Sequence, residues 1–325
     1  MEGRRGNGRK EMYELDSIIC VVGPTASGKT ELALRLAETL SGEIVSCDSM
    51  QLYRRMDIGT AKPTPDELAR ARHHMIDVCE PDEAFSVGKY VQMADACVQD
   101  ILSRGKTAII TGGTGLYADS LISGRTFAPV PQTGVRERLQ ARLAAEGGDA
   151  LLRELACVDP VTAARLHPAD EKRIVRALEV FLETGEPISR HNERTRQQPD
   201  QYEPVWLGLD FADRAALYER IDRRVDKMRA AGLEREVREL LASGVPAAAT
   251  AMQAIGYKEL AGALRGDCTF DEAYDLIKRR SRNYAKRQLT WFRRNSRMRW
   301  LIREAADDDA SIFRAALQEI PFFAG

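Results

Sequence analysis

The stretch VVGPTASGKTELALRL, residues 21–36, decides the fold, because it joins a strand end, a glycine loop and a helix start. Gly23, Gly28, Lys29 and Thr30 have the G-x-x-x-x-G-K-[ST] spacing of a phosphate-binding loop. In such a loop the backbone N–H groups and the positive helix end surround a phosphate, the lysine adds a charge, and the hydroxyl can bind magnesium. The loop predicts a phosphorylated ligand but does not distinguish ATP from another diphosphate. A glycine turn with a structural lysine is the weaker alternative.

Apolar, β-branched runs bounded by turn residues predict a series of strands, at 17–23, 42–48, 74–80, 107–113 and 205–210, with a short further strand at 298–302. Helical patterns lie between several of them, including 29–40 and 86–103. Strands that alternate with helices predict an α/β fold, with a P-loop-type parallel sheet core covered by helices. Ligands of such sheets collect at the carboxyl ends of the strands.

The pattern changes between Arg125 and Pro204, where helices are predicted without strands, at 132–146, 148–156 and 170–184, followed by a polar stretch. We therefore expect a helical insertion domain at 125–204 on a core formed by 12–124 and 205–325. The second part of the core is expected to hold helices at 213–231, 233–243, 256–264 and 270–294. The polar, basic start, residues 1–11, is expected to be a disordered tail.

Composition narrows the class of protein. The chain has 325 residues, 44% of them hydrophobic, which is enough for a full core. No apolar run approaches the length of a membrane helix or of a signal peptide, so we expect a soluble, cytoplasmic protein without a membrane partner. The six cysteines are scattered without zinc-ligand spacing, which indicates reduced thiols.

Two further motifs follow predicted strands. Asp48 and Gln51 lie after the second strand, whose end is expected beside the phosphate loop. The carboxylate could bind magnesium, act as a general base or cap the next helix, and the local sequence leaves these alternatives open. The segment TGGTGLY, 111–117, adds Thr114 to the same crevice, although its glycines are equally typical of a turn that needs positive φ.

The segment 278–300 is strongly basic and contains no acid. Its cations are Lys278, Arg279, Arg280, Arg282, Lys286, Arg287, Arg293, Arg294, Arg297 and Arg299. A solvated helix face is the usual explanation of such a run, but the absence of acids favours a surface for a phosphate backbone. The predicted insertion has a second basic segment with Lys172, Arg173 and Arg176.

Seven motifs carry a resemblance to a known family. In chain order they are GPTASGKTELA, DSMQLYRRMDIGTAKP, GGTGLY, HPADEKRIVRALEVF, RIDRRVDKM, MQAIGYKEL and AKRQLTWFR. Together they resemble the tRNA dimethylallyltransferase family over about residues 18–300, and the second motif is far more specific than the phosphate loop. Because the chain shows no zinc-finger extension of the eukaryotic kind, the resemblance is to bacterial members, and it implies a monomer.

The resemblance implies transfer of a dimethylallyl group from dimethylallyl diphosphate to the 6-amino group of the tRNA adenosine next to the anticodon, on its 3′ side. It implies Asp48 as the base, with Thr25 and Arg224 also in the catalytic site. Mg²⁺ at Thr30 would be the cofactor. The diphosphate would then be held by the loop residues Gly23, Pro24, Thr25, Ala26, Ser27, Gly28, Lys29 and Thr30.

The resemblance also implies a tRNA-binding surface. The target base must flip out of the anticodon loop to reach a crevice, and the insertion would grip the anticodon stem. The residues implied are Asp48, Ser49, Met50, Gln51, Thr114, Arg136, Lys172, Arg173, Arg176, Gln253, Gly256, Tyr257, Lys258, Lys286 and Arg287. Lys172 departs from the family, where we expect Gln.

Two other classes of function remain open from the residues. A small-molecule kinase would use the same loop with the insertion as a lid, but it leaves the basic aromatic helix unexplained. A non-catalytic RNA-binding protein would not need Asp48 in the crevice.

Overall fold

The structure is a computed structural model that describes residues 18–127 and 133–321. The expected tail at 1–11 lies outside the described residues. By their internal contacts the residues divide into two units, one formed by 1–124 with 201–325 and the other by 125–200. In the described parts of the chain, no helix combines the length and apolar character needed to cross a membrane.

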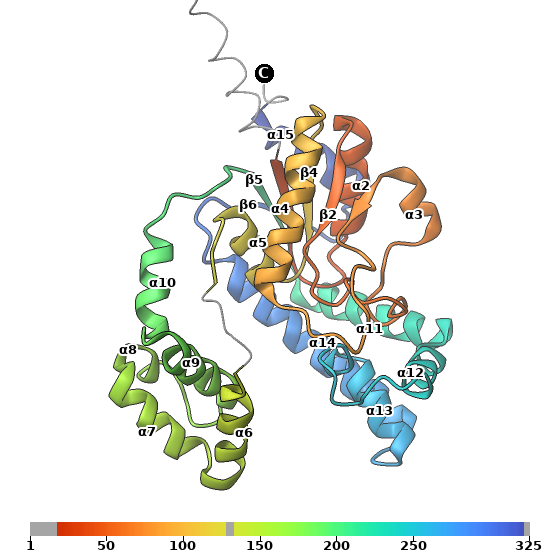
Figure 1. The fold of residues 1–325 in the computed structure, drawn as a ribbon. Helices are drawn as coiled ribbons and strands as arrows, with labels where there is room; N and C mark the ends of the chain where they lie inside the picture. The colour runs from red at the N-terminus through yellow and green to blue at the C-terminus, as the bar shows by residue number, and fades with distance from the viewer. Residues whose placement is uncertain (1–17, 128–132, 322–325) are drawn as a thin grey trace, which may run out of the picture. The chain divides into compact units, whose positions relative to one another are not determined.

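The core of the first unit is a six-stranded sheet in which every pairing is parallel. Its order is β3-β2-β4-β1-β5-β6. The strands are β1 (Ile18–Val22), β2 (Glu43–Ser46), β3 (His73–His74), β4 (Ala108–Gly112), β5 (Val205–Phe211) and β6 (Arg299–Arg303). The predicted α/β class with a parallel, helix-covered sheet is confirmed (Figure 1).

Helices cover both faces of the sheet, as the alternation of side chains along β1 shows. Ile19 and Val21 pack with α2 (Lys29–Leu40) and α15 (Asp309–Gln318). Ile18, Cys20 and Val22 pack on the other face with α4 (Val87–Ser103) and α5 (Gly115–Ile122). The short helix α3 (Pro65–Arg70) leads into β3. A strand buried on both faces explains why the sequence reads as a continuous apolar run.

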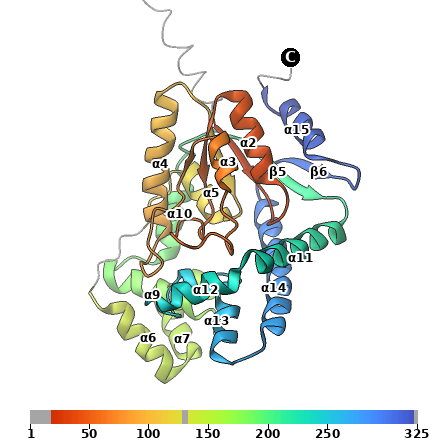
Figure 2. The ribbon, with the colours of Figure 1, turned by 90° about the vertical axis from the view of Figure 1, so that its right-hand side faces the viewer.

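A second cluster of helices packs below the carboxyl ends of the strands (Figure 2). It contains α11 (Arg214–Ala231), α12 (Leu233–Ala242), η1 (Ala251–Gln253), α13 (Tyr257–Arg265) and α14 (Phe270–Phe292). Its core joins Val225, Leu240 and Ile277 of these helices to Tyr53 and Met56 from the segment after β2. This cluster therefore encloses the edge of the sheet where ligands of parallel sheets bind.

The second unit, 125–200, is built from helices α6 (Val135–Glu146), α7 (Gly148–Val158), α8 (Pro160–Ala163), α9 (Glu171–Thr184) and α10 (Ile188–Arg196). It has its own apolar core around Leu139, Leu155 and Leu178. Its described residues contain no strand. Helix α10 lies in the stretch that looked only polar, because its sequence ISRHNERTR has almost no apolar stripe to reveal a helix.

The predicted strand at 74–80 is wrong beyond its first residue. β3 ends at His74, and the next residues turn, because Met75 and Asp77 adopt left-handed φ angles of 62° and 56°. The chain then runs beside the segment after β2, where Val78 N donates to Leu52 O at 2.8 Å. The segment therefore holds the loop that follows Asp48 instead of extending the sheet.

The second strand is not a direct neighbour of the first. β2 does not adjoin β1, because β4 lies between them and pairs with both. The phosphate loop and Asp48 nevertheless share one cavity, as expected, because the ends of β1, β4 and β2 lie at the same edge of the sheet. Thr114, which follows β4, connects the ends of β4 and β2, since its Oγ1 accepts a hydrogen bond from Ser49 N at 3.1 Å.

Candidate active site

The phosphate loop joins β1 to α2 in a conformation that its glycines permit. Gly28 has a φ of 93°, which side chains rarely adopt, and it immediately precedes α2. Lys29 donates from Nζ to Pro24 O at 2.9 Å, so the loop folds back on its own lysine. The buried Ser27 Oγ finds no hydrogen-bond partner among the described residues. Such a loop is arranged to receive an anion.

Lys29 and Arg224 form a pair of cations at this loop. Burial, together with the positive charge of Arg224, lowers the pKa of Lys29 to about 8. Burial also lowers the pKa of Arg224, while the negative charge of Asp48 opposes that shift. No carboxylate in the described chain forms an ion pair with either cation. Two neighbouring cations without a bound acid favour an anionic ligand.

Asp48 follows β2 and has two different carboxylate oxygens. Oδ1 accepts a hydrogen bond from Met50 N at 2.8 Å, so Asp48 caps a turn and not a helix, because the next helix begins only at Pro65. Oδ2 receives no hydrogen bond from the described residues. The cap therefore fixes the direction of the carboxyl group and leaves one oxygen available to accept a proton.

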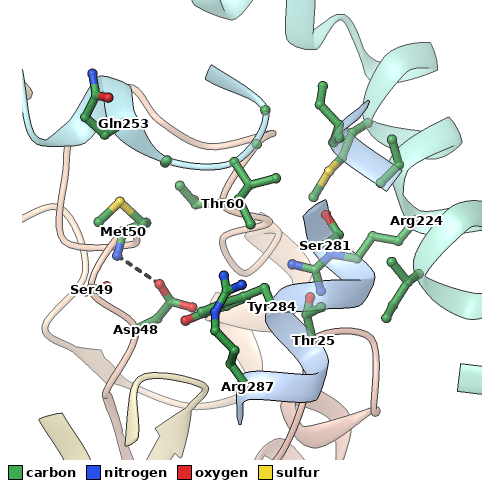
Figure 3. A pocket seen from close by; sticks show the side chains of 18 of the residues that line it. Thr25, Asp48, Ser49, Met50, Thr60, Arg224, Gln253, Ser281, Tyr284 and Arg287 are labelled. Carbon is green, nitrogen blue, oxygen red and sulfur yellow. Dashed lines mark hydrogen bonds between the residues drawn. The ribbon is translucent and has the colours of Figure 1, made fainter. Parts of the chain in front are cut away.

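Asp48 lines a cavity of about 390 Å³ within the first unit. One part of its wall is polar and carries Thr25, Arg224, Ser281, Tyr284 and Arg287 besides Asp48. Figure 3 shows the side chains of Asp48, Tyr284, Arg287 and Arg224 pointing into the same space. The rest of the wall is largely apolar, with Met50, Ile221, Val225, Met228, Ala254, Ile255 and Ile277. This cavity suits a ligand with a charged head and a hydrocarbon tail.

Helix α14, which carries most of the basic segment, supplies a wall of the cavity through Ser281 and Tyr284, which the sequence did not indicate as site residues. Ser281 and Tyr284 stand one turn apart on this helix, and Arg287 follows one turn later. Burial and the nearby charge of Asp48 raise the pKa of Tyr284 to about 12. The guanidinium of Arg287 lies over the Tyr284 ring, 5.5 Å from its centroid. The sequence did hold a signal for this cavity wall, because Ser281 and Tyr284 interrupt the run of cations at the spacing of one helical face.

The glycines of TGGTGLY are required by close approach and not by positive φ. Gly112, Gly113 and Gly115 are absent from the described residues with positive φ, so the alternative of a turn that needs positive φ does not apply. A Cβ at Gly113 would collide with the Gln288 side chain, and one at Gly115 would collide with Trp291. The segment is therefore shaped to let α14 approach the sheet.

Glu236 is a second residue that the sequence did not indicate. Its carboxylate, buried on α12, accepts hydrogen bonds from Asp57 N at 2.9 Å, Ile58 N at 2.8 Å and Gly59 N at 3.1 Å. It also accepts from the hydroxyl of Tyr257. Because Gly59 and Thr60 line the cavity, Glu236 anchors a loop of its wall.

The residues expected at the tRNA surface fall into two groups within the first unit. Asp48, Ser49, Met50, Gln253, Gly256 and Arg287 line the cavity. Gln51 and Tyr257 do not line the cavity. Gln51 donates to Ala61 O at 3.1 Å, and the buried Tyr257 donates to Glu236. Lys258 is exposed beside the cavity residue Gly256.

The basic run is less free of acids than its sequence suggests. Carboxylates from other segments form ion pairs with Lys278, Arg280, Arg282, Arg293 and Arg299. Lys286 and Arg287 are exposed and have no carboxylate partner among the described residues. The phosphate-binding surface therefore stays a prediction, carried by the exposed cations that form no ion pair with a described residue, among them Arg279, Lys286, Arg287 and Arg294.

The expected tRNA contacts of the second unit lie on α6 and α9. Arg136 and Arg176 both bond to the buried Glu179, at 2.7 and 3.0 Å. Arg173 pairs with Asp170 at 3.3 Å, whereas Lys172 is exposed and forms no ion pair with a described residue. Glu179 thus holds two guanidinium groups in fixed positions on one surface of this unit.

Three features define a P-loop-type group-transfer site: a phosphate loop beside two cations that form no ion pair with a described residue, a carboxylate with one oxygen that no described residue hydrogen-bonds, and a cavity with an apolar wall. Comparison with known proteins then identifies the family. Residues 51–295 match the IPP transferase family. The chain belongs to this family.

Individual relatives agree with the family match. The chain is 48% identical to a tRNA dimethylallyltransferase of Desulforudis audaxviator over 284 residues, 87% of this chain and 91% of that protein. It is 49% identical to one from Geobacter metallireducens, over 89% of this chain and 93% of that protein. Among solved structures, a tRNA isopentenylpyrophosphate transferase from Bacillus halodurans is 38% identical with a TM-score of 0.70, covering 95% of this chain and 98% of its own. A eukaryotic dimethylallyltransferase acting on tRNA, 25% identical, has a TM-score of 0.80, covering 95% of this chain and 80% of its own.

Proposed function

We propose that this chain transfers a dimethylallyl group from dimethylallyl diphosphate to the 6-amino group of the tRNA adenosine that follows the anticodon on its 3′ side. The observation that carries the proposal is the two-sided cavity, with Lys29 and Arg224 near its polar wall and an apolar wall on α11 and α14. The diphosphate would lie at the loop, and the five-carbon tail would lie against the apolar side chains.

The chemistry assigns a role to each polar group. The adenine nitrogen attacks the allylic carbon, the carbon–oxygen bond breaks, and the diphosphate leaves with the electron pair of that bond. An exocyclic adenine amine is a weak nucleophile, so a base that accepts its proton during attack accelerates the step. We assign that role to Asp48, whose Oδ1 is held by Met50 N and whose Oδ2 is free among the described residues.

Negative charge grows on the diphosphate as the bond breaks. Cations and N–H groups already in place at the loop stabilise that charge more in the transition state than in the ground state. Lys29, Arg224 and the backbone of residues 23–30 are the groups we assign to this role, with Thr25 in the cavity wall. A hydrocarbon tail buried away from water also protects the developing allylic cation from hydrolysis.

Magnesium is the metal that fits the loop. The donors near the diphosphate are hydroxyl and carboxylate oxygens, which hard divalent cations prefer. The described residues contain no cluster of three or more His, Cys, Asp or Glu that would hold a metal by themselves. Thr30, exposed at the start of α2, would therefore hold Mg²⁺ jointly with the diphosphate. When bound, the ion would neutralise part of the diphosphate charge.

The adenine must leave the stacked anticodon loop to reach Asp48. We propose that the residues of the cavity rim, including Ser49, Gln253 and Arg287, receive the flipped nucleotide. We further propose that the helical unit 125–200 grips the anticodon stem through Arg136, Lys172, Arg173 and Arg176. Lys172 would contribute charge where the family pattern has an amide.

A prenylation assay tests the function. The purified chain is incubated with dimethylallyl diphosphate, Mg²⁺ and an unmodified tRNA that has adenosine at the target position, without ATP. Digestion and mass spectrometry should show adenosine heavier by one dimethylallyl group, and a matched tRNA with guanosine there should show none. An absence of product, or an absolute need for ATP, would contradict the proposal. ATP turnover with a small acceptor would favour the kinase alternative, and tRNA binding without product would favour the RNA-binding alternative.

A further inference from the structure

We propose that Gln288 is a positioning residue that holds the phosphate loop in register with the cavity wall while the diphosphate leaves. The proposal rests on the transfer reaction proposed above. Gln288 lies on α14 and is only 5% exposed. Nothing in the chemistry of the reaction requires an amide at this position, so its contacts must explain it.

The Gln288 amide joins two loops that are distant in sequence. Its Oε1 accepts a hydrogen bond from Thr25 N at 2.9 Å, and its Nε2 donates to Gly113 O at 2.9 Å. Both partners are main-chain groups, one in the phosphate loop and one in the glycine turn after β4. These two contacts need a side chain that accepts one hydrogen bond and donates another. The Gln amide does both without a change of protonation.

The bond to Thr25 fixes one particular peptide group. The N–H of the Pro24–Thr25 peptide is held by Gln288, and its carbonyl accepts from Lys29 Nζ at 2.9 Å. Ser27 N also donates to that carbonyl, at 3.3 Å. When Lys29 turns toward a bound diphosphate, the carbonyl loses its charged donor. Gln288 then becomes the main side-chain restraint on this peptide, so its contribution is largest in the bound state.

The same helix carries the opposite wall of the cavity. Ser281 and Tyr284 lie two turns and one turn before Gln288 and line the cavity, as does Arg287. The contact of Gln288 with Gly113 leaves no room for a Cβ at that glycine. Gln288 therefore sets the distance between the diphosphate cradle and the side chains that face the adenine.

A purely structural role makes a different prediction, so the two can be separated. A buried amide that only stabilises the fold would lower the unfolding temperature without affecting ligand binding at temperatures where the protein is folded. A positioning residue changes binding of the diphosphate in particular. The probe is inorganic diphosphate with Mg²⁺, measured by calorimetry on the full chain, with tRNA binding measured in parallel.

For Gln288→Leu we expect diphosphate binding to weaken at least tenfold and the KM for dimethylallyl diphosphate to rise, while tRNA affinity stays within twofold. Trp291→Phe is the matched control, because Trp291 Nε1 donates to Asp119 Oδ2 at 2.8 Å from the same helix without touching the phosphate loop. It should lower thermal stability yet keep diphosphate affinity within twofold. A folded Gln288→Leu protein that binds diphosphate like the wild type would overturn the proposal.

Gln288→Glu gives a second test if the leucine variant does not fold. An ionised Glu would repel Gly113 O, whereas a protonated one can accept and donate as the amide does. The ratio of variant to wild-type diphosphate affinity should therefore rise as pH falls, and a ratio that stays constant with pH would overturn the proposal. A wild-type chain that forms no prenylated adenosine would contradict the proposed function alone, because these binding comparisons do not depend on turnover.

Discussion

Arg224 on α11 lies close enough to Lys29 in the phosphate loop that its positive charge adds to burial in lowering the pKa of that lysine to about 8. Like charges held near each other in a half-buried place repel, and an anion bound beside them removes the repulsion. The free protein is thus arranged to gain the most from a ligand with high negative charge density. This relation leads to a pH-dependent prediction.

Diphosphate affinity should be greatest below pH 8 and should fall as the pH rises above it. Lys29 is cationic below its pKa of about 8 and loses its proton above it, whereas an unperturbed lysine would stay charged to about pH 10. Lys29→Met is the reference, since it reports the effect of pH on the ligand and on all other groups. The ratio of wild-type to variant affinity, measured by calorimetry, should drop by up to tenfold per pH unit above pH 8. A ratio unchanged between pH 7 and pH 10 would remove Lys29 from the site.

Asp48→Asn should abolish most turnover and leave tRNA binding nearly intact. The amide keeps the hydrogen bond that Oδ1 accepts from Met50 N, so the loop geometry is preserved. It cannot accept the proton of the attacking amine, and loss of a general base costs on the order of 10²–10⁴ in rate. Single-turnover kinetics with saturating tRNA measure this loss. If the single-turnover rate constant remains within threefold of the wild type, Asp48 is not the base.

Glu236→Gln should destabilise the fold and loosen one wall of the cavity. The carboxylate accepts four hydrogen bonds through two oxygens, and an amide must turn its NH₂ group toward two of the donors. We expect a loss of about 2–3 kcal/mol in the free energy of unfolding, measured by urea titration. Tyr257→Phe removes a single hydrogen bond to the same carboxylate and should cost less. Equal stability of the glutamine variant and the wild type would show that the loop does not depend on Glu236.

The sequence was sufficient to predict the elements that form through contacts between neighbouring residues. The loop spacing and the apolar run before it predicted β1 and the helix that begins at Lys29, because both depend on neighbouring residues. Asp48 and Thr114 could be placed at one edge of the sheet because parallel strands end together. The interposed position of β4 could not be derived, since strand order depends on helix packing that the pattern does not encode.

The residues that the sequence did not reveal act across long separations. Glu236 bonds to a backbone segment 179 residues away, and Gln288 bonds to one 263 residues away. Glu236 belongs to none of the quoted motifs, and Gln288 lies in AKRQLTWFR, whose basic residues drew attention in place of the amide. Each stands on a helix whose periodicity explains it equally well as an ordinary residue. The acids that pair with part of the basic run were hidden for the same reason, since they come from other elements, among them α11, α13 and β5.

The exposed cations of α14 that form no ion pair with a described residue predict that tRNA affinity depends on salt concentration. Each contact between a cation and a phosphate releases a counterion, so log affinity for tRNA should fall linearly with log salt concentration. Lys286 is exposed and lacks a carboxylate partner among the described residues, and its ammonium group lies 5.7 Å from the centroid of the Tyr218 ring. Lys286→Ala should therefore reduce the slope by about 0.7–1 and weaken binding at low salt.

Lys278→Ala is the matched control for that measurement, because it removes a lysine of the same helix that already pairs with Asp226 at 2.6 Å. A charge neutralised within the protein releases few counterions on binding RNA, so this variant should keep the wild-type slope. Filter binding between 50 and 300 mM salt distinguishes the two variants. Equal slopes for both would mean that the tRNA backbone does not pass Lys286, and a slope near zero for the wild type would exclude a phosphate-binding surface on this face of α14.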